Sequence, residues 1–371
     1  MARSLMKLFG DRLALVGMTT GDEPTGSWTK KEISGTSYWF FPACHRKPSP
    51  KKPLIPARLE FYAGLRRYKD RILSLDCRAA FLQSPEALLA VSSWRWDSLC
   101  FWFAGVENPL TRSRYWYAAP FYRFFDKSFF SALDRVDILL AAADEPAMNQ
   151  LVFRSHGRLA HDRLYQLPTC VDTSEFCPAP ARTARTKLEI PLDCKVFVNT
   201  GRIGRFKGWE LLVDAFDEFR RKNNDALLFF VGDGEDRPTL EKHIFDRNLR
   251  AQVRITGFLK PTQIVSYLNA ANAVVFGSLV EGWSVSMLEA LACGKAIVST
   301  PVSGTDAMII PGQNGFIVNG RNPASFAEAM ESALRLDDAG HVSRSIAAQF
   351  DLTRLGERLG SFWAPLRPER A

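Results

Sequence analysis

The sequence predicts an α/β protein built on doubly wound, mainly parallel sheets. Through the carboxyl-terminal half, short apolar runs alternate with longer segments whose apolar residues recur at helical spacing. Glycine-rich or acidic turns follow several of the apolar runs, where strands would end. Strands separated by helices pair in parallel and bury both faces of their sheet. A chain of 371 residues is long enough for two such domains.

The carboxyl-terminal half has the clearer pattern. Pro261 stands near the first turn of one expected helix, and Gly294 can end another in a left-handed cap. We expect strands at 194–203, 226–236, 252–259, 272–278 and 295–300, with the apolar run 315–320 after them. We expect helices at 208–222, 237–249, 261–271, 284–293 and 323–336.

The amino-terminal half has a weaker pattern of the same kind. We expect strands at 13–18, 79–84, 98–105, 137–143 and 163–169, and helices around 57–71, 113–133 and 146–155. The segment from Pro168 to Thr186 has the composition of a linker, and residues 352–366 can form a final helix. No internal repeat or low-complexity tract is present.

Composition narrows the class of protein. The chain is 46% apolar and 24% charged, as in soluble globular proteins, and no apolar run approaches the ~20 residues of a membrane helix. The amino terminus lacks the features of a signal peptide. Seven scattered cysteines predict a reducing compartment, with neither a disulfide framework nor a zinc site. We therefore expect a cytoplasmic protein.

Two motifs are the strongest candidates for a site. GRIGRFKG spans 201–208, and EGWSVSMLEA begins at Glu281 after an apolar run. Both lie where strands end, so they should meet at the sheet edge where ligands of such folds bind. Arg202 and Lys207 can neutralise a diphosphate, and nearby glycines (Gly201 and Gly204) let the backbone approach it closely.

The second motif complements the first. The NH groups of Ser284, Val285 and Ser286 begin a helix, where unpaired donors and the helix dipole favour an anion. Glu281 and Glu289 can each accept hydrogen bonds from hydroxyl groups. The two motifs therefore indicate a sugar-nucleotide site. Their glycine spacing matches neither the dehydrogenase fingerprint nor the Walker loop.

The carboxyl-terminal half also resembles a known family. The segments PTCVDTSEF, NTGRIGRFKGWELLVDAF, FVGDGED, ITGFL and VEGWSVSMLEALACGKAIVSTPVSG are similar to family 4 of the retaining glycosyltransferases, also called glycosyl transferases group 1. The resemblance covers roughly residues 168–330. It implies the GT-B fold, in which two Rossmann-like doubly wound domains face each other across a cleft. The domains would span 1–175, on the acceptor side, and 176–350, with 351–371 crossing back to the first.

The resemblance also implies roles for single residues. Arg202 and Lys207 would hold the donor diphosphate, Glu281 the transferred sugar and Glu289 the ribose. Gly282 belongs to the same donor-binding motif, and the backbone around Phe258 would border the base. The family retains anomeric configuration, and the resemblance implies a hexosyltransferase that needs neither a metal nor a cofactor.

The sequence departs from the family at three places. The usual first strand and its glycine-rich loop have no counterpart at the start of this chain. The histidine that often follows a middle strand of the first domain is absent, and Glu107 or Asn108 would stand in its place on the acceptor side. Asp306 replaces a commoner glutamate.

Charge and aromatic residues suggest where the protein acts. Residues 45–71 hold nine Lys and Arg against two Asp and Glu, in a chain of net charge +8. Aromatic residues mixed with cations in RYWYAAPFYRFFDKSFF suit either an aromatic core or the interface of an anionic membrane. We therefore expect a peripheral position on the inner face of the membrane, a glycan or lipid-linked acceptor, and a role in surface polysaccharide biosynthesis.

Three other interpretations stay open at this point. A sugar-nucleotide epimerase could use the same fold but would need acid and base groups that the sequence does not identify. A catalytically weak sugar-nucleotide-binding subunit would keep the donor site without turnover. A nucleic-acid-binding module could account for the positive charge, but no recognised motif accompanies it, so we expect no nucleic-acid partner.

Overall fold

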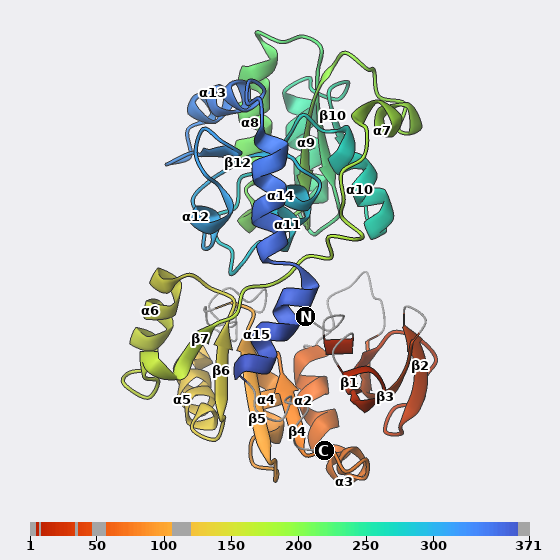
Figure 1. Ribbon diagram of the computed structural model, residues 1–371, viewed down its shortest axis with the longest axis vertical. Helices are drawn as coiled ribbons and strands as arrows, with labels where there is room; N and C mark the ends of the chain where they lie inside the picture. The colour runs from red at the N-terminus through yellow and green to blue at the C-terminus, as the bar shows by residue number, and fades with distance from the viewer. Residues whose placement is uncertain (1–4, 7–8, 34–35, 47–56, 106–119, 363–371) are drawn as a thin grey trace. The chain divides into compact units, whose positions relative to one another are not determined.

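The computed structural model describes residues 5–6, 9–33, 36–46, 57–105 and 120–362. The chain divides into two compact units. One contains Met1–Pro168 together with Leu355–Ala371, and the other contains Thr169–Arg354. Figure 1 labels most of the elements of each unit. Among the described helices, none is long and apolar enough to cross a membrane.

The carboxyl-terminal unit is built on a six-stranded sheet in which every neighbouring pair is parallel. The strand order is β10-β9-β8-β11-β12-β13. The strands are β8 (Lys195–Thr200), β9 (Ala226–Val231), β10 (Val253–Ile255), β11 (Ala273–Phe276), β12 (Ala296–Ser299) and β13 (Gly315–Ile317). The chain winds outward from β8 in one direction and then from β11 in the other. The sheet therefore has its topological switch point between β8 and β11, where Rossmann-like sheets bind ligands.

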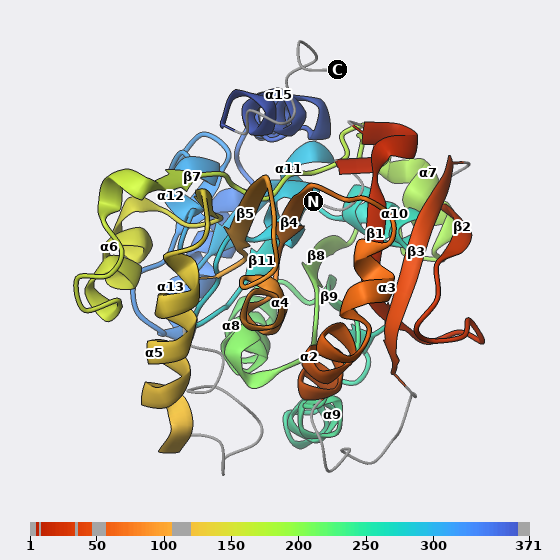
Figure 2. The same cartoon turned by 90° about the horizontal axis from the view of Figure 1, so that it is seen from below.

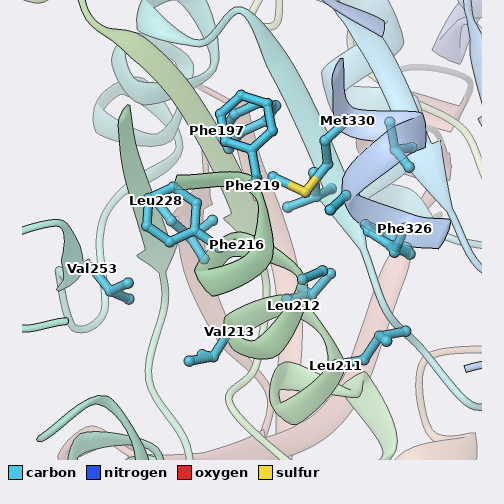
Figure 3. Packing of buried hydrophobic residues seen from close by; sticks show 14 of the residues in the cluster. Phe197, Leu211, Leu212, Val213, Phe216, Phe219, Leu228, Val253, Phe326 and Met330 are labelled. Atoms are coloured by element: carbon cyan, nitrogen blue, oxygen red, sulfur yellow. The ribbon is translucent and has the colours of Figure 1, made fainter. Parts of the chain in front are cut away.

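Helices cover both faces of this sheet, as the sequence predicts. They are α7 (Ala181–Lys187), α8 (Trp209–Arg220), α9 (Arg237–Asp246), α10 (Pro261–Ala270), α11 (Val285–Ala292), α12 (Thr305–Met308), α13 (Pro323–Ala333) and α14 (Ala339–Gln349). Phe197, Leu228 and Val275 face α8, α9 and α13 in one apolar cluster, part of which Figure 3 shows. The alternate strand residues Val198 and Val274 are buried as well. Burial on both faces explains why these strands appear as continuous apolar runs.

Two other details of this unit test the predictions. Gly294 follows α11 with φ +68°, which confirms the predicted left-handed cap. The expected linker Pro168–Thr186 is only partly irregular, because residues from Ala181 onward form α7. Arg185 of α7 anchors that helix by donating to the backbone oxygens of Ala270 and Leu192.

The amino-terminal unit has two smaller sheets. Four parallel strands run in the order β4-β5-β6-β7, and three run in the order β1-β3-β2. These strands are β1 (Ala14–Thr19), β2 (Thr29–Ile33), β3 (Thr36–His45), β4 (Ala79–Leu82), β5 (Ser98–Phe103), β6 (Ile138–Ala141) and β7 (Leu164–Gln166). The helices are α2 (Ala57–Arg67), α3 (Lys69–Leu73), α4 (Pro85–Val91), α5 (Tyr122–Leu133) and α6 (Glu145–Arg154), and the chain returns to this unit along α15 (Leu352–Phe362).

The sequence did not predict β2, β3, α4 or α14. β2 pairs antiparallel with β3, which pairs parallel with β1, so this part of the chain breaks the strand–helix alternation. Pro42 lies inside β3, where the β1 partner shifts register between Gly17 and Met18. Proline lacks an NH for the ladder and weakens a strand prediction unless a bulge or an edge accommodates it. Here the irregularity in the ladder accommodates it.

Candidate active site

The predicted site motifs meet at the switch point of the six-stranded sheet. Lys207 ends the short 3-10 helix η4 (Arg205–Lys207) after β8, and Glu281 lies in the loop after β11. The Nζ of Lys207 lies 2.6 Å from Oε1 of Glu281. The Ser278 hydroxyl donates to the same carboxylate oxygen at 2.8 Å. Two residues that are 74 positions apart in the sequence therefore form one half-buried ion pair between adjacent strands.

The backbones of the two loops are also in direct contact. The Leu279 NH donates to the Phe206 carbonyl at 2.8 Å. Gly208 has φ +64°, and a Cβ on it would lie 1.7 Å from the Gly277 carbonyl oxygen. Arg321 donates to that oxygen at 2.9 Å. Only glycine at position 208 allows both the left-handed turn and this approach, which sets the position of Lys207 beside Glu281.

Arg202 lies on the other side of the same loop. Its Nε is 2.7 Å from Oε2 of Glu235, which follows β9, and both side chains are about half exposed. The loops after β8 and β9 are in contact through the hydrogen bond from the Ile203 NH to the Asp233 carbonyl. The two predicted phosphate-binding cations therefore pair with carboxylates from different loops.

The start of α11 faces the glycine-rich loop. Ser284 is the N-cap, with extended backbone angles, and its hydroxyl accepts a hydrogen bond from the Met287 NH. A Cβ on Gly201 would lie 3.6 Å from the Ser286 hydroxyl oxygen, so a bare backbone borders the first turn of the helix. Val285 stays exposed there. The predicted helix start is therefore confirmed, and it lies against the loop that carries Arg202 and Lys207.

Glu289 lies on α11, with a half-buried side chain. Burial raises the pKa of its carboxyl to about 7, and the neighbouring carboxylate of Glu175 raises it further in the same direction. A hydrogen bond to the ionised form would lower this pKa again. A hydroxyl-bearing ligand at Glu289 would therefore bind better when the carboxyl is ionised.

A further group of exposed residues follows β9 and β10. Phe258 is 86% exposed in the loop after β10. Gly257 beside it has φ +75°, and its Cβ position lies 3.4 Å from the Arg237 guanidinium. Arg237 pairs with Asp233 at 3.0 Å and with Glu241 at 2.8 Å. This polar edge adjoins the Arg202 side of the site through the loop after β9.

The structure adds partners that sequence analysis did not name. Ser278 holds Glu281, Glu235 holds Arg202, and Glu175 lies near Glu289. Glu235 belongs to the acidic turn GDGED at a strand end, which was the available signal. Glu107 and Asn108 lie outside the described residues. Among the described residues, no group of three or more His, Cys, Asp and Glu could hold a metal ion, and metal independence stays a prediction.

The architecture matches solved glycosyltransferases of the GT-B class. A sucrose-phosphate synthase from Thermosynechococcus elongatus superposes with a TM-score of 0.75 over 95% of this chain and 88% of its own, at 18% identity. Anabaena HepE in complex with UDP-glucose superposes with a TM-score of 0.66 over 86% of this chain and 85% of its own, at 16% identity. At these identities the similarity shows the fold alone, and it confirms the predicted fold class.

Sequence comparison matches part of the chain to a known family. Residues 181–348 match the model for glycosyl transferases group 1, so the chain carries a domain of that family, as predicted. An alpha-D-kanosaminyltransferase from Streptomyces kanamyceticus is 29% identical over 57% of this chain and 56% of its own length. A D-inositol 3-phosphate glycosyltransferase from Corynebacterium urealyticum is 30% identical over 56% of this chain and 50% of its own. The chain thus spans about half the length of the curated relatives it matches.

Proposed function

We propose that this protein is a retaining glycosyltransferase that transfers a hexose from a nucleoside diphosphate sugar to a glycan or lipid-linked acceptor. The observation that carries the proposal is the Lys207–Glu281 pair at the switch point of the sheet, beside the first turn of α11. It combines a cation for a leaving diphosphate with a carboxylate for sugar hydroxyls.

The reaction breaks the bond between the anomeric carbon and a phosphate oxygen. Positive charge develops on the sugar ring and negative charge on the leaving diphosphate, so preorganised donors around the diphosphate lower the barrier. Arg202, Lys207 and the backbone NH groups that begin α11 provide such donors. They supply the charge that many transferases obtain from a divalent ion, which supports a metal-independent reaction.

The ion pairs imply an exchange of partners when the donor binds. A diphosphate reaching Lys207 would compete with Glu281, and one reaching Arg202 would compete with Glu235. The carboxylate of Glu281, still held by Ser278, then becomes available to the hydroxyls of the transferred sugar. Glu289, eight residues further along, would accept the ribose hydroxyls, and Phe258 would border the base.

The named relatives support this assignment. The sequence relatives are named as transferases of sugars, one of them to D-inositol 3-phosphate, and Anabaena HepE was solved with UDP and with UDP-glucose. We place the enzyme in the cytoplasm at the inner face of the membrane, in surface polysaccharide synthesis, because basic and aromatic segments accompany the transferase domain. Its partners would be the donor, the acceptor and an anionic membrane surface.

Thermal stabilisation by nucleoside diphosphates and their sugars tests the donor site. A ligand that binds only the folded protein raises its melting temperature by mass action. At a ligand concentration of about a hundred times Kd, the free energy of unfolding rises by about 2.7 kcal/mol. We expect one nucleotide class to stabilise the protein equally with and without a chelator, and Lys207→Ala and Arg202→Ala to remove the shift. Lys242→Ala, which removes an exposed cation of α9 paired with Asp246, is the matched control. If no nucleotide shifts the melting temperature, the proposed donor site is wrong.

A further inference from the structure

The first two turns of α5 carry aromatic side chains that the fold does not bury. Phe129, Phe130 and Leu133 pack into the core of the amino-terminal unit. Phe121 and Phe124, in contrast, are 63% and 73% exposed. One side of this helix therefore packs into an aromatic core, while the other side is exposed. The sequence left open whether this segment forms a core or a membrane interface, and each alternative fits one face of the helix.

The helical spacing explains this division. Buried Phe129 and Phe130 follow Phe124 by five and six residues, which places them across the helix from it at 3.6 residues per turn. Phe125 stacks on Phe129 with ring centroids 5.9 Å apart, so its ring stays with the core. Phe124 thus points away from the packed face and contributes little to folding.

Cations accompany the exposed aromatic rings. Arg123 and Lys127 are exposed on the same two turns. The Arg123 Nε donates to the Tyr122 hydroxyl at 3.0 Å, and its guanidinium lies 5.8 Å from the centre of that ring. Within residues 120–131 the acidic side chain is Asp126, which is buried and lies 3.6 Å from Arg154. The exposed face of these turns is therefore aromatic and positive.

The opposite, packed face of α5 borders a cavity of the same unit through Phe129. A cavity of about 400 Å³ is lined by residues after β4 and β5, including Ser84 and Gly105, and by Phe129 and Arg154. Arg154 is the residue that contacts Asp126 on α5. The carboxyl ends of parallel strands are where ligands of such sheets bind. Figure 2 shows α5 on the outside of this unit, next to α4.

We propose that the first turns of α5, with Phe121, Arg123, Phe124 and Lys127, dock the protein on an anionic lipid bilayer. Phenylalanine side chains enter the boundary between headgroups and acyl chains, while arginine and lysine meet anionic headgroups. Docking there would hold the amino-terminal unit, the acceptor side of the proposed enzyme, at the lipid surface. The inference rests on the proposed position at the inner membrane face and names the surface responsible.

Co-flotation of the full chain with vesicles tests the proposal. We expect binding to vesicles of phosphatidylcholine with phosphatidylglycerol, and little binding to phosphatidylcholine alone, at about 0.1 M salt. Replacing both Phe121 and Phe124 with Ser should lower the partition coefficient by on the order of tenfold or more, since each ring loses apolar burial. Replacing Arg123 and Lys127 with Ser should lower it about tenfold and reduce its salt dependence.

The controls separate this surface from the general proposal. Phe245→Ser removes an exposed phenylalanine of α9 in the other unit and should leave vesicle binding unchanged. Unaltered melting temperatures and donor binding would show that the α5 variants fold. Vesicle binding that persists in the Phe121 and Phe124 variant would overturn the docking surface while leaving the membrane position standing. Absence of vesicle binding by the wild type would overturn both the docking surface and the membrane position. If the wild type were a dimer and the Phe121 and Phe124 variant a monomer, the face would instead bind a second copy of the chain.

Discussion

The two units of this protein differ in how much of their function the local sequence determines. In the carboxyl-terminal unit, every site loop follows directly from a parallel strand, so residues distant in sequence meet at one sheet edge, as Lys207 and Glu281 do. In the amino-terminal unit, an antiparallel pair, a register shift and two separate sheets interrupt the alternation. Strand topology alone therefore places the proposed donor site in one unit, while the proposed acceptor side depends on tertiary packing in the other.

The first prediction, with the largest expected effect, concerns removal of the charge of Glu281 in the carboxyl-terminal unit. Glu281→Gln keeps the size of the side chain but weakens its pairing with Lys207 and its acceptance of sugar hydroxyls. We expect kcat to fall on the order of 10²-fold or more, because interactions of this kind act on the charge that develops in the transition state. The melting temperature should change little, since the Gln side chain keeps an oxygen that can accept from Lys207 and Ser278. The measurement is kcat and KM with the donor identified by thermal shift.

Glu241→Gln is the control for that experiment. Glu241 pairs with Arg237 on the surface of α9, so its loss should leave kcat within a factor of two or so. Equal kcat in Glu281→Gln and the wild type at saturating donor would refute the assignment of Glu281 to the sugar.

The second prediction concerns the backbone that joins the loops. Gly208→Ala adds a Cβ 1.7 Å from the Gly277 carbonyl at φ +64°, so the loops after β8 and β11 must separate. The left-handed conformation alone costs about 1–2 kcal/mol for a residue with a Cβ. We expect a lower melting temperature and loss of donor stabilisation, measured by calorimetry with and without nucleotide.

Gly320→Ala isolates the contribution of backbone strain. Gly320 has φ +79°, but a Cβ there meets nothing within 4 Å. This variant should show the strain and keep donor binding. If Gly208→Ala behaved identically, close approach of the two loops would not be what positions Lys207.

The parallel topology explains why the sequence predicts the positions of the site motifs in the carboxyl-terminal unit. Apolar periodicity and strand-end glycines locate the motifs at 201–208 and 281–290, because parallel topology converts sequence position into spatial position. The same periodicity gives no register, so it could not show that Glu235 would reach Arg202 or that Ser278 would hold Glu281. In the amino-terminal half, Pro42 and the polar β2 obscured a mixed sheet, in which β3 pairs antiparallel with β2 and parallel with β1.

A third prediction uses the titration of Glu289. Its pKa is raised to about 7, so between the ordinary value near 4.5 and 7 the folded protein holds a proton that the unfolded chain releases. Stability from this carboxyl is therefore present at low pH and lost as pH rises through 7. Glu289→Gln should melt higher than the wild type at pH 8, and this advantage should shrink at pH 5.

Donor binding should have the opposite dependence on pH. An intact sugar nucleotide, whose diphosphate does not titrate near neutrality, should bind the wild type more weakly as pH falls from 8 to 6, because the ribose hydroxyls prefer the ionised carboxylate. Glu289→Gln should bind the sugar nucleotide with a higher Kd, and that Kd should be nearly constant across this pH range. Parallel pH profiles in the two proteins would contradict a role for Glu289 in binding the ribose.

The smallest effect is expected near the place where the chain leaves the carboxyl-terminal unit. Burial alone would raise the pKa of Asp351, but hydrogen bonds from the backbone and hydroxyl groups of Thr173 and Thr353 lower it to about 2. The stability that this carboxylate provides is present above its ordinary value of 3.8 and is lost as pH falls toward 2. Asp351→Asn should lower the free energy of unfolding by about 1–2 kcal/mol at pH 7, with a smaller difference below pH 3.

Denaturant unfolding at several pH values checks this, with the exposed Asp193→Asn as control. The two threonines belong to separate passages of the chain, one just after Pro168 and one just before Leu355, where the chain crosses between the units. Asp351 therefore fastens the two crossing segments together within the carboxyl-terminal unit. If the difference in unfolding free energy between Asp351→Asn and the wild type did not change with pH, the side chain would act through packing and not as an ionised acceptor. The crossing segments would then be held together without a contribution from its charge.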